Sequence, residues 1–195
     1  HQGNLKELSM RTYTTLLRLG LFPILLLSFF APPLFSYVLG ERWFDAGAFA
    51  RVLGPWIALV FAYSPMSSLY AVLDRQGMGL LFEIIYITTR VAAFFLGALL
   101  GGPLIATSFF GLTGFLIVFL KMNYILSVAG NNLRNILRKN LKMFLETLLM
   151  VVFPIIALLL SFPFYVLVFS LILSTAAYFI RVLSLVKSKN TGGRK

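Results

Sequence analysis

Residues 80–126 read LLFEIIYITTRVAAFFLGALLGGPLIATSFFGLTGFLIVFLKMNYIL, two long apolar runs separated by Gly101, Gly102 and Pro103. A helix needs roughly 20 apolar residues to cross hydrocarbon about 30 Å thick. Each run has that length, and the Gly-Gly-Pro sequence between them ends one helix and lets another begin. The stretch therefore predicts two transmembrane helices joined by a tight turn.

The composition of the whole chain also indicates a membrane protein. Of its 195 residues, 59% are hydrophobic and 12% are charged, whereas a soluble domain carries about 25% charged residues. The chain has no Cys and a single histidine, His1, which excludes a disulfide framework and a two-histidine metal site within it. We expect no cofactor and no metal. Because the sequence opens on His and shows no signal-peptide pattern, we expect it to be a piece of a longer protein.

Outward from residues 80–126, the same pattern predicts an all-α, polytopic transmembrane helical bundle of about six spans. The expected spans are 16–39, 52–73, 80–100, 104–126, 143–162 and 164–182. A polar loop is expected at 40–51 and a tight polar turn at 74–77. The expected organisation is a cytoplasmic amphipathic lead-in (1–20), a four-helix part (16–126), a basic cytoplasmic linker (127–142), a C-terminal helix pair (143–182) and a disordered basic tail (183–195).

The positive charges predict the orientation. With six spans, 14 of the 17 Lys and Arg residues fall on one side, only Arg42 and Arg51 fall on the other, and Arg90 lies within a span. The positive-inside rule places the basic side, and with it both ends of this chain, in the cytoplasm. The net charge of +11 is concentrated next to the membrane. We therefore expect membrane lipids with anionic headgroups as partners, and no nucleic acid.

Arg90 is the most unusual residue of the predicted spans. An Arg at the centre of a membrane helix costs about 2.5–3.5 kcal/mol, so it needs a partner or a watery cavity. Glu83 lies two helical turns earlier, and Tyr86 and Thr89 lie near the same face. We predict a substrate-binding polar stripe of these residues, in which Arg90 binds an anionic group such as a phosphate. The structural alternative is an ion pair between Arg90 and Glu83, or between Arg90 and an absent part of the protein.

Other polar residues are weaker candidates. The second span holds residues that could line a cavity but are more typical of close helix packing: Tyr63, Ser64, Ser67, Ser68 and Tyr70. Glu146 is expected to pair with Lys142, four residues earlier. The sequence contains no HExxH, GxSxG or P-loop motif and no paired carboxylates at the membrane surface, so we do not expect an enzyme.

Four stretches carry a resemblance to a known family. They are NLKELSMRTYTTLLRLG at 4–20, FPILLLSFFAPPLFSYVLG at 22–40, GERWFDAGAFARVLGPWIAL at 40–59 and SPMSSLYAVLDRQG at 64–77. In this order, a basic segment precedes a Pro-containing span, a Gly-Glu-x-Trp loop and a Ser-Pro helix that ends in an Arg-Gln turn. The chain resembles the bacterial polysaccharide-export flippases, including O-antigen flippases, of the multidrug/oligosaccharidyl-lipid/polysaccharide exporter superfamily. The resemblance covers roughly residues 5–130.

The resemblance implies a fold and a function. The chain would be the C-terminal half of a MATE-like, two-lobed transporter in the bacterial inner membrane, and an N-terminal lobe of the same protein would be missing from it. The substrate would be an undecaprenyl-pyrophosphate-linked oligosaccharide, a repeat unit of surface polysaccharide such as lipopolysaccharide O-antigen, moved by alternating access. The alternatives are a multidrug or cation exporter of the same superfamily, a membrane-embedded transferase, and a purely structural membrane subunit.

Overall fold

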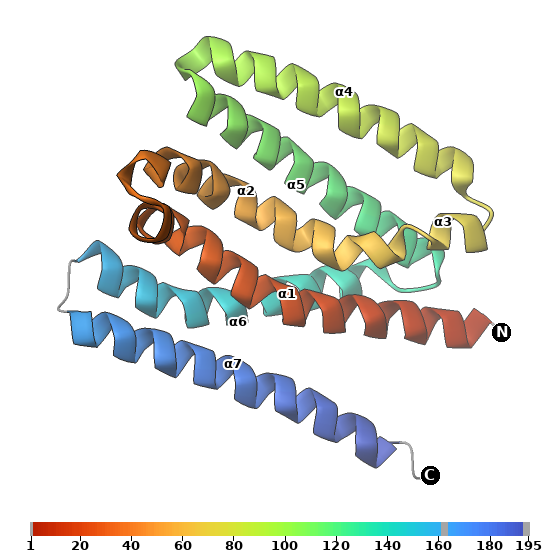
Figure 1. The fold of residues 1–195 in the computed structure, drawn as a ribbon. Coiled ribbons are helices and arrows are strands. Elements are labelled where there is room, and N and C mark those ends of the chain that lie inside the picture. Colours follow the sequence, from red (N-terminus) through yellow and green to blue (C-terminus); the bar gives the residue numbers. More distant parts are fainter. Residues whose placement is uncertain (1, 161–163, 193–195) are drawn as a thin grey trace. The chain divides into compact units, whose positions relative to one another are not determined.

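A computed structural model gives the fold of the chain. It describes the backbone of residues 2–160 and 164–192, and the side chains of 5–157, 160 and 169–183. The described residues form helices and turns and contain no strand, as the sequence predicts (Figure 1). The helices are α1 (Gln2–Leu39), η1 (Glu41–Trp43), α2 (Phe44–Tyr63), η2 (Ser64–Met66), α3 (Leu69–Val72), α4 (Gln76–Gly101), α5 (Pro103–Val128), α6 (Leu133–Leu159) and α7 (Phe164–Gly192).

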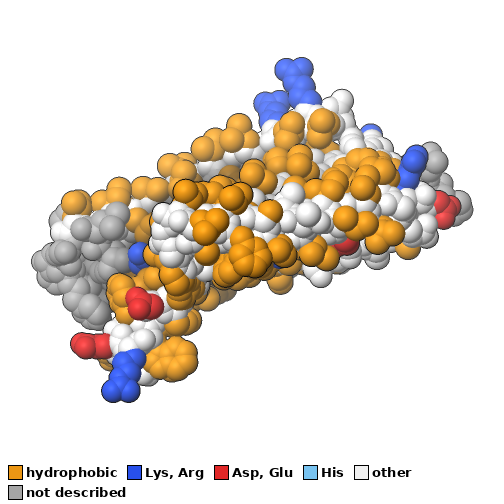
Figure 2. Space-filling view, turned by 90° about the horizontal axis from the view of Figure 1, so that it is seen from above, with side chains coloured by type: hydrophobic (Ala, Val, Ile, Leu, Met, Phe, Trp, Pro, Cys, Tyr) orange, Lys and Arg blue, Asp and Glu red, His pale blue; other side chains and the backbone are white. Residues whose placement is uncertain are grey.

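Five helical segments of the described residues are long and apolar enough to cross a membrane, which makes the chain a multi-span membrane protein by length and composition. They are Leu5–Leu39, Glu41–Val72, Gln76–Gly101, Pro103–Val128 and Leu133–Ala157. The sixth expected span, 164–182, falls within α7, where the described apolar stretch is the shorter Phe169–Leu183. The face seen in Figure 2 is apolar over most of its area, and the Lys and Arg side chains that it shows lie toward its edges.

Three expected boundaries differ from the structure. Residues 44–51, expected in a loop, form the first turns of α2, because the Ala-rich run that follows Asp45 favours a helix. Residues 133–142, expected in the linker 127–142, all belong to α6, and the Asn132 side chain accepts a hydrogen bond of 2.9 Å from the Arg134 backbone N–H at its start. The tail expected to be disordered continues α7 as far as Gly192, since 183–191 hold neither Pro nor Gly. Residues 193–195 lie outside the described residues.

The chain divides into two compact units, His1–Leu141 and Lys142–Lys195. In the first unit, α1 packs along α2, α2 along α5, and α5 along α4 (Figure 1). Small residues allow these close approaches: a Cβ added to Gly97 of α4 would lie 2.7 Å from the Cα of Ala106 in α5. Such contacts between small residues are typical of membrane helices, where packing rather than burial from water holds helices together. The second unit contains the rest of α6 and α7, with an ion pair of 2.5 Å between Glu146 and Arg181.

The turn between α5 and α6 lies within the first unit and has a defined hydrogen-bond pattern. Gly130 has a φ of +91°, a left-handed conformation that suits Gly. The backbone N–H of Gly130 donates to the Ser127 carbonyl at 2.9 Å, and that of Asn131 donates to the Leu126 carbonyl at 3.1 Å. Together these bonds form a Schellman motif, which stops α5 and directs the chain back toward α1.

Candidate functional site

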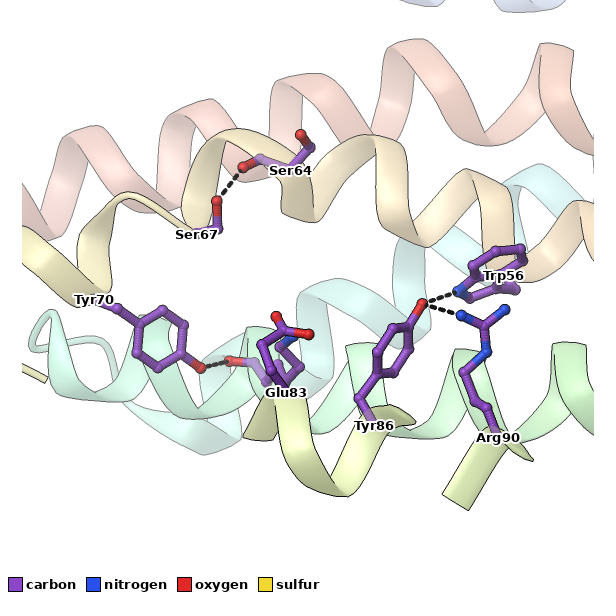
Figure 3. Close-up of polar contacts among 8 residues, drawn as sticks. Trp56, Ser64, Ser67, Tyr70, Glu83, Tyr86 and Arg90 are labelled. Atoms are coloured by element: carbon purple, nitrogen blue, oxygen red, sulfur yellow. Dashed lines mark hydrogen bonds and ion pairs between the residues drawn. The ribbon is translucent and has the colours of Figure 1, made fainter. Parts of the chain in front are cut away.

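Arg90 lies in an aromatic cage formed by three helices of the first unit, and Figure 3 shows two of its rings, Trp56 and Tyr86, beside the guanidinium. Its guanidinium carbon lies 3.5 Å from the ring centroid of Phe110 in α5, 4.1 Å from that of Trp56 in α2 and 4.7 Å from that of Tyr86 in α4. The residue is 9% exposed. Cation–π contacts of this kind contribute about 0.5–2 kcal/mol each, so the rings offset part of the cost of burying the charge.

The hydrogen bonds of the cage satisfy only one end of the guanidinium. Arg90 Nη1 donates to the Tyr86 hydroxyl at 2.7 Å, and Trp56 Nε1 donates to the same hydroxyl at 3.2 Å (Figure 3). Arg90 Nε and Nη2 are buried and have no hydrogen-bond partner within the described part of the chain. An aromatic ring is a much weaker hydrogen-bond acceptor than an oxygen atom. The Nε and Nη2 donors of the guanidinium therefore remain available to an anion or to water.

Gly114 of α5 makes room for the cage. A Cβ at this position would lie 3.0 Å from two atoms of the Trp56 indole and 3.1 Å from Arg90 Nε. All three contacts are tighter than ordinary van der Waals contact, so any larger residue would displace the indole or the guanidinium. The cage therefore depends on a glycine that contributes no chemistry of its own.

A second charged group lies beside the cage. Lys121 of α5 is 2% exposed, and its ammonium forms an ion pair with the carboxylate of Glu83, whose side chain is half exposed. The Lys121 Nζ also lies 5.0 Å from the ring centroid of Tyr63 and 5.1 Å from that of Tyr86. Tyr70 donates a long hydrogen bond of 3.4 Å to the Lys121 carbonyl (Figure 3). Tyr86 thus lies between the two cations.

The structure brings together three of the four predicted site residues. Arg90 and Tyr86 are hydrogen-bonded, and Glu83 reaches the same cluster through Lys121. The Thr89 hydroxyl takes no part in these side-chain contacts and donates to two carbonyls of its own helix, that of Ile85 at 2.7 Å and that of Tyr86 at 3.3 Å. The alternative ion pair between Arg90 and Glu83 is absent from the described contacts, and Lys121 takes the carboxylate instead.

Of the weaker candidates, some lie in the cluster and others do not. Tyr63 and Tyr70 are buried beside Lys121. The Ser67 and Ser68 hydroxyls donate to carbonyls three residues earlier, at 2.7 and 3.0 Å, so they satisfy the bend at Pro65 rather than reach the cluster. The expected pair of Glu146 with Lys142 is present at 3.9 Å, a weaker contact than that of Glu146 with Arg181.

Three members of the cluster were not predicted from the sequence: Trp56, Phe110 and Lys121. Lys121 was counted among the cytoplasmic charges because Asn123 and the basic linker follow it closely. A signal for its burial was present, since apolar residues lie on both sides of it in α5. The aromatic residues gave no signal, because the chain has 20 Phe and nothing in their spacing distinguishes Phe110.

The cluster has the charge balance of an anion site. Arg90 and Lys121 supply two positive charges and Glu83 one negative charge, and the carboxylate is already paired. No group of three or more His, Cys, Asp or Glu side chains that could hold a metal occurs among the described residues. The unpaired Nε and Nη2 of Arg90 are the donors that a bound anion would use.

Comparison of the chain with protein-family models, with curated proteins and with solved structures found no match.

Proposed function

We propose that the chain is the C-terminal part of a flippase that translocates lipid-linked oligosaccharides across the bacterial inner membrane by alternating access. The substrate class is an undecaprenyl-pyrophosphate-linked repeat unit, and an N-terminal lobe of the same protein would complete a MATE-like transporter. The five helices of the described residues that are long and apolar enough to cross a membrane are consistent with a transporter of this kind.

One observation carries the proposal: the buried Arg90 guanidinium with Nε and Nη2 unpaired. A planar guanidinium donates two parallel hydrogen bonds to a phosphate. Leaving charged donors unpaired in a membrane protein is costly, and ionisable residues within membrane helices are found mostly on substrate or ion paths. A pyrophosphate-linked lipid supplies the acceptors that the cage lacks. The sequence resemblance over residues 5–130 points to the same cargo.

The alternative functions have less support. A drug or cation exporter needs a carboxylate that is free to bind a cation, but Glu83 is paired with Lys121. A transferase needs acidic or histidine groups around a reacting atom, and the described cluster has one paired carboxylate and no histidine. A purely structural subunit gives no reason for the unpaired donors of Arg90.

The proposal is tested by complementation. The gene that encodes this chain, with any coding sequence upstream, is expressed in a bacterial strain that lacks its O-antigen flippase, and surface polysaccharide is measured. We expect wild type to restore polysaccharide and Arg90→Ala to abolish the restoration. Arg51→Ala is the matched control, because Arg51 also lies over an aromatic ring and donates to a carbonyl, that of Phe29 at 3.1 Å, but lies outside the cluster.

Equal protein levels in the membrane fraction are required for the comparison. Restoration by both variants would show that Arg90 does not bind the cargo. Loss in both variants would assign the effect to helix packing. A third outcome is that wild type does not restore polysaccharide in this strain. If cells that express it then export a cationic dye, the drug or cation exporter is favoured.

A further inference from the structure

A second polar site lies in the first unit, at the end where α1 begins and α5 gives way to α6. A cavity of about 480 Å³ is lined there by residues of α1, the α5–α6 turn and the first part of α6. Three of these residues are cations, Lys6, Arg11 and Lys139, and one is a carboxylate, Glu7. The cavity therefore carries an excess of positive charge.

The walls of the cavity are held in place by buried polar contacts. Asn131 in the turn donates to the Lys6 carbonyl and to the Ser9 hydroxyl, both at 3.3 Å. The hydroxyl of Tyr13 donates to Asn140 Oδ1 at 2.5 Å, and both side chains are buried. These contacts join α1 to the turn and to the start of α6, so the cavity is lined by elements that pack against one another.

The three cations line this cavity with exposed side chains. The Tyr13–Asn140 bond joins α1 to α6, the helices that carry Arg11 and Lys139, and both cations line the cavity. Like charges held together repel, and the repulsion is relieved when an anion binds between them. Glu7 takes part in none of the ion pairs between described residues. No ion pair among the described residues neutralises Arg11 or Lys139.

The chemistry points to a phosphate group. Arg and Lys donors converging on one cavity suit phosphate oxygens, and basic pockets between membrane helices on the cytoplasmic side bind anionic lipid headgroups. The size is within the range of small-ligand pockets, about 300–1,000 Å³. We propose that this cavity binds a phosphate-bearing group at the membrane surface, through Lys6, Arg11 and Lys139. The inference does not depend on transport or on the Arg90 cluster.

The test uses the purified full chain in detergent with zwitterionic lipid. Its thermal unfolding is followed during titration with phosphatidylglycerol and, separately, with inorganic phosphate. The double variant Arg11→Gln/Lys139→Gln removes two charges from the cavity. The matched control is Arg134→Gln/Arg138→Gln, which removes two exposed charges near the same cavity that do not line it.

We expect phosphatidylglycerol to stabilise wild type and the control saturably. The midpoint of the effect should rise on the order of thirtyfold in the cavity variant, about fivefold for each charge removed. Stabilisation by phosphatidylglycerol alone identifies a lipid headgroup as the ligand, and stabilisation by inorganic phosphate as well identifies a soluble phosphate. An equal response of the two double variants, or no response of wild type to either titrant, overturns the proposal. If the double variant does not fold, Lys139→Gln is compared with its neighbour Arg138→Gln by the same criteria.

Discussion

Replacing Glu83 by Gln tests whether the Lys121–Glu83 ion pair stabilises the first unit. The change keeps the size of the side chain but leaves the Lys121 ammonium, which is 2% exposed, without its counter-ion. Removing one partner of a buried ion pair costs about 3–5 kcal/mol. Glu83 is half exposed, and two aromatic rings still face the ammonium. We therefore expect a loss of about 2 kcal/mol in the free energy of unfolding.

The assay is thermal unfolding of the purified chain in detergent, followed by circular dichroism. A loss of about 2 kcal/mol corresponds to a fall in Tm of roughly 4–8 °C for a chain of this size. Glu41→Gln makes the same chemical change at an exposed carboxylate and should leave Tm within about 1 °C of wild type. Lys121→Met removes the buried charge and leaves a carboxylate that water reaches, so its effect should be smaller than that of Glu83→Gln.

The order of these effects is what the reasoning predicts. If Glu83→Gln unfolds at the wild-type temperature, the ammonium does not need its counter-ion and the pair contributes nothing. If Lys121→Met is the more damaging variant, the aliphatic packing of Lys121 matters more than its charge. Either result would refute the argument from burial.

Two further predictions follow from the packing and from the charge distribution. Gly114→Ala should displace Trp56 or Arg90, shift the indole emission of the folded protein and lower the free energy of unfolding by about 1–3 kcal/mol. Unchanged emission and an unchanged Tm would mean that the cage tolerates a methyl group. Since the chain has no Cys, single introduced cysteines report topology directly. Lys139→Cys should react with a membrane-impermeant maleimide only after the cells are opened. Arg42→Cys should react with the same reagent in intact cells whose outer membrane has been made permeable. Labelling of both from the same side would contradict the predicted orientation.

The spans were predictable because hydropathy alone sets them. Apolar runs as long as 80–100 and 104–126 are unfavourable in contact with water. Gly102, with a φ of +86°, ends α4 where the sequence predicts the break. The structure places 44–51, predicted as part of a polar loop, and 133–142, predicted as part of a basic linker, in helices. Helices extend beyond the hydrocarbon wherever the residues are good helix formers, and hydropathy does not register that extension.

The site was predictable only in part, for a different reason. Arg90 stands out in the sequence because it is expensive in a membrane, and helical spacing alone places Tyr86 one turn away. Its other neighbours, Trp56 and Phe110, come from separate helices, and no local pattern tells which of many aromatic residues a given Arg will meet. Helix–helix register decides that, and the register depends on small residues such as Gly114 that carry no functional signal of their own.

The central claim, that Arg90 holds an anion within its aromatic cage, is tested most directly through Trp56. The chain has two Trp residues, so Trp43→Phe leaves Trp56, 4.1 Å from the guanidinium carbon, as the reporter of the cage. We predict a saturable change in Trp56 emission when inorganic pyrophosphate is added, with an apparent affinity at least about tenfold weaker after Arg90→Gln. The same response with and without the Arg90 guanidinium would contradict the account.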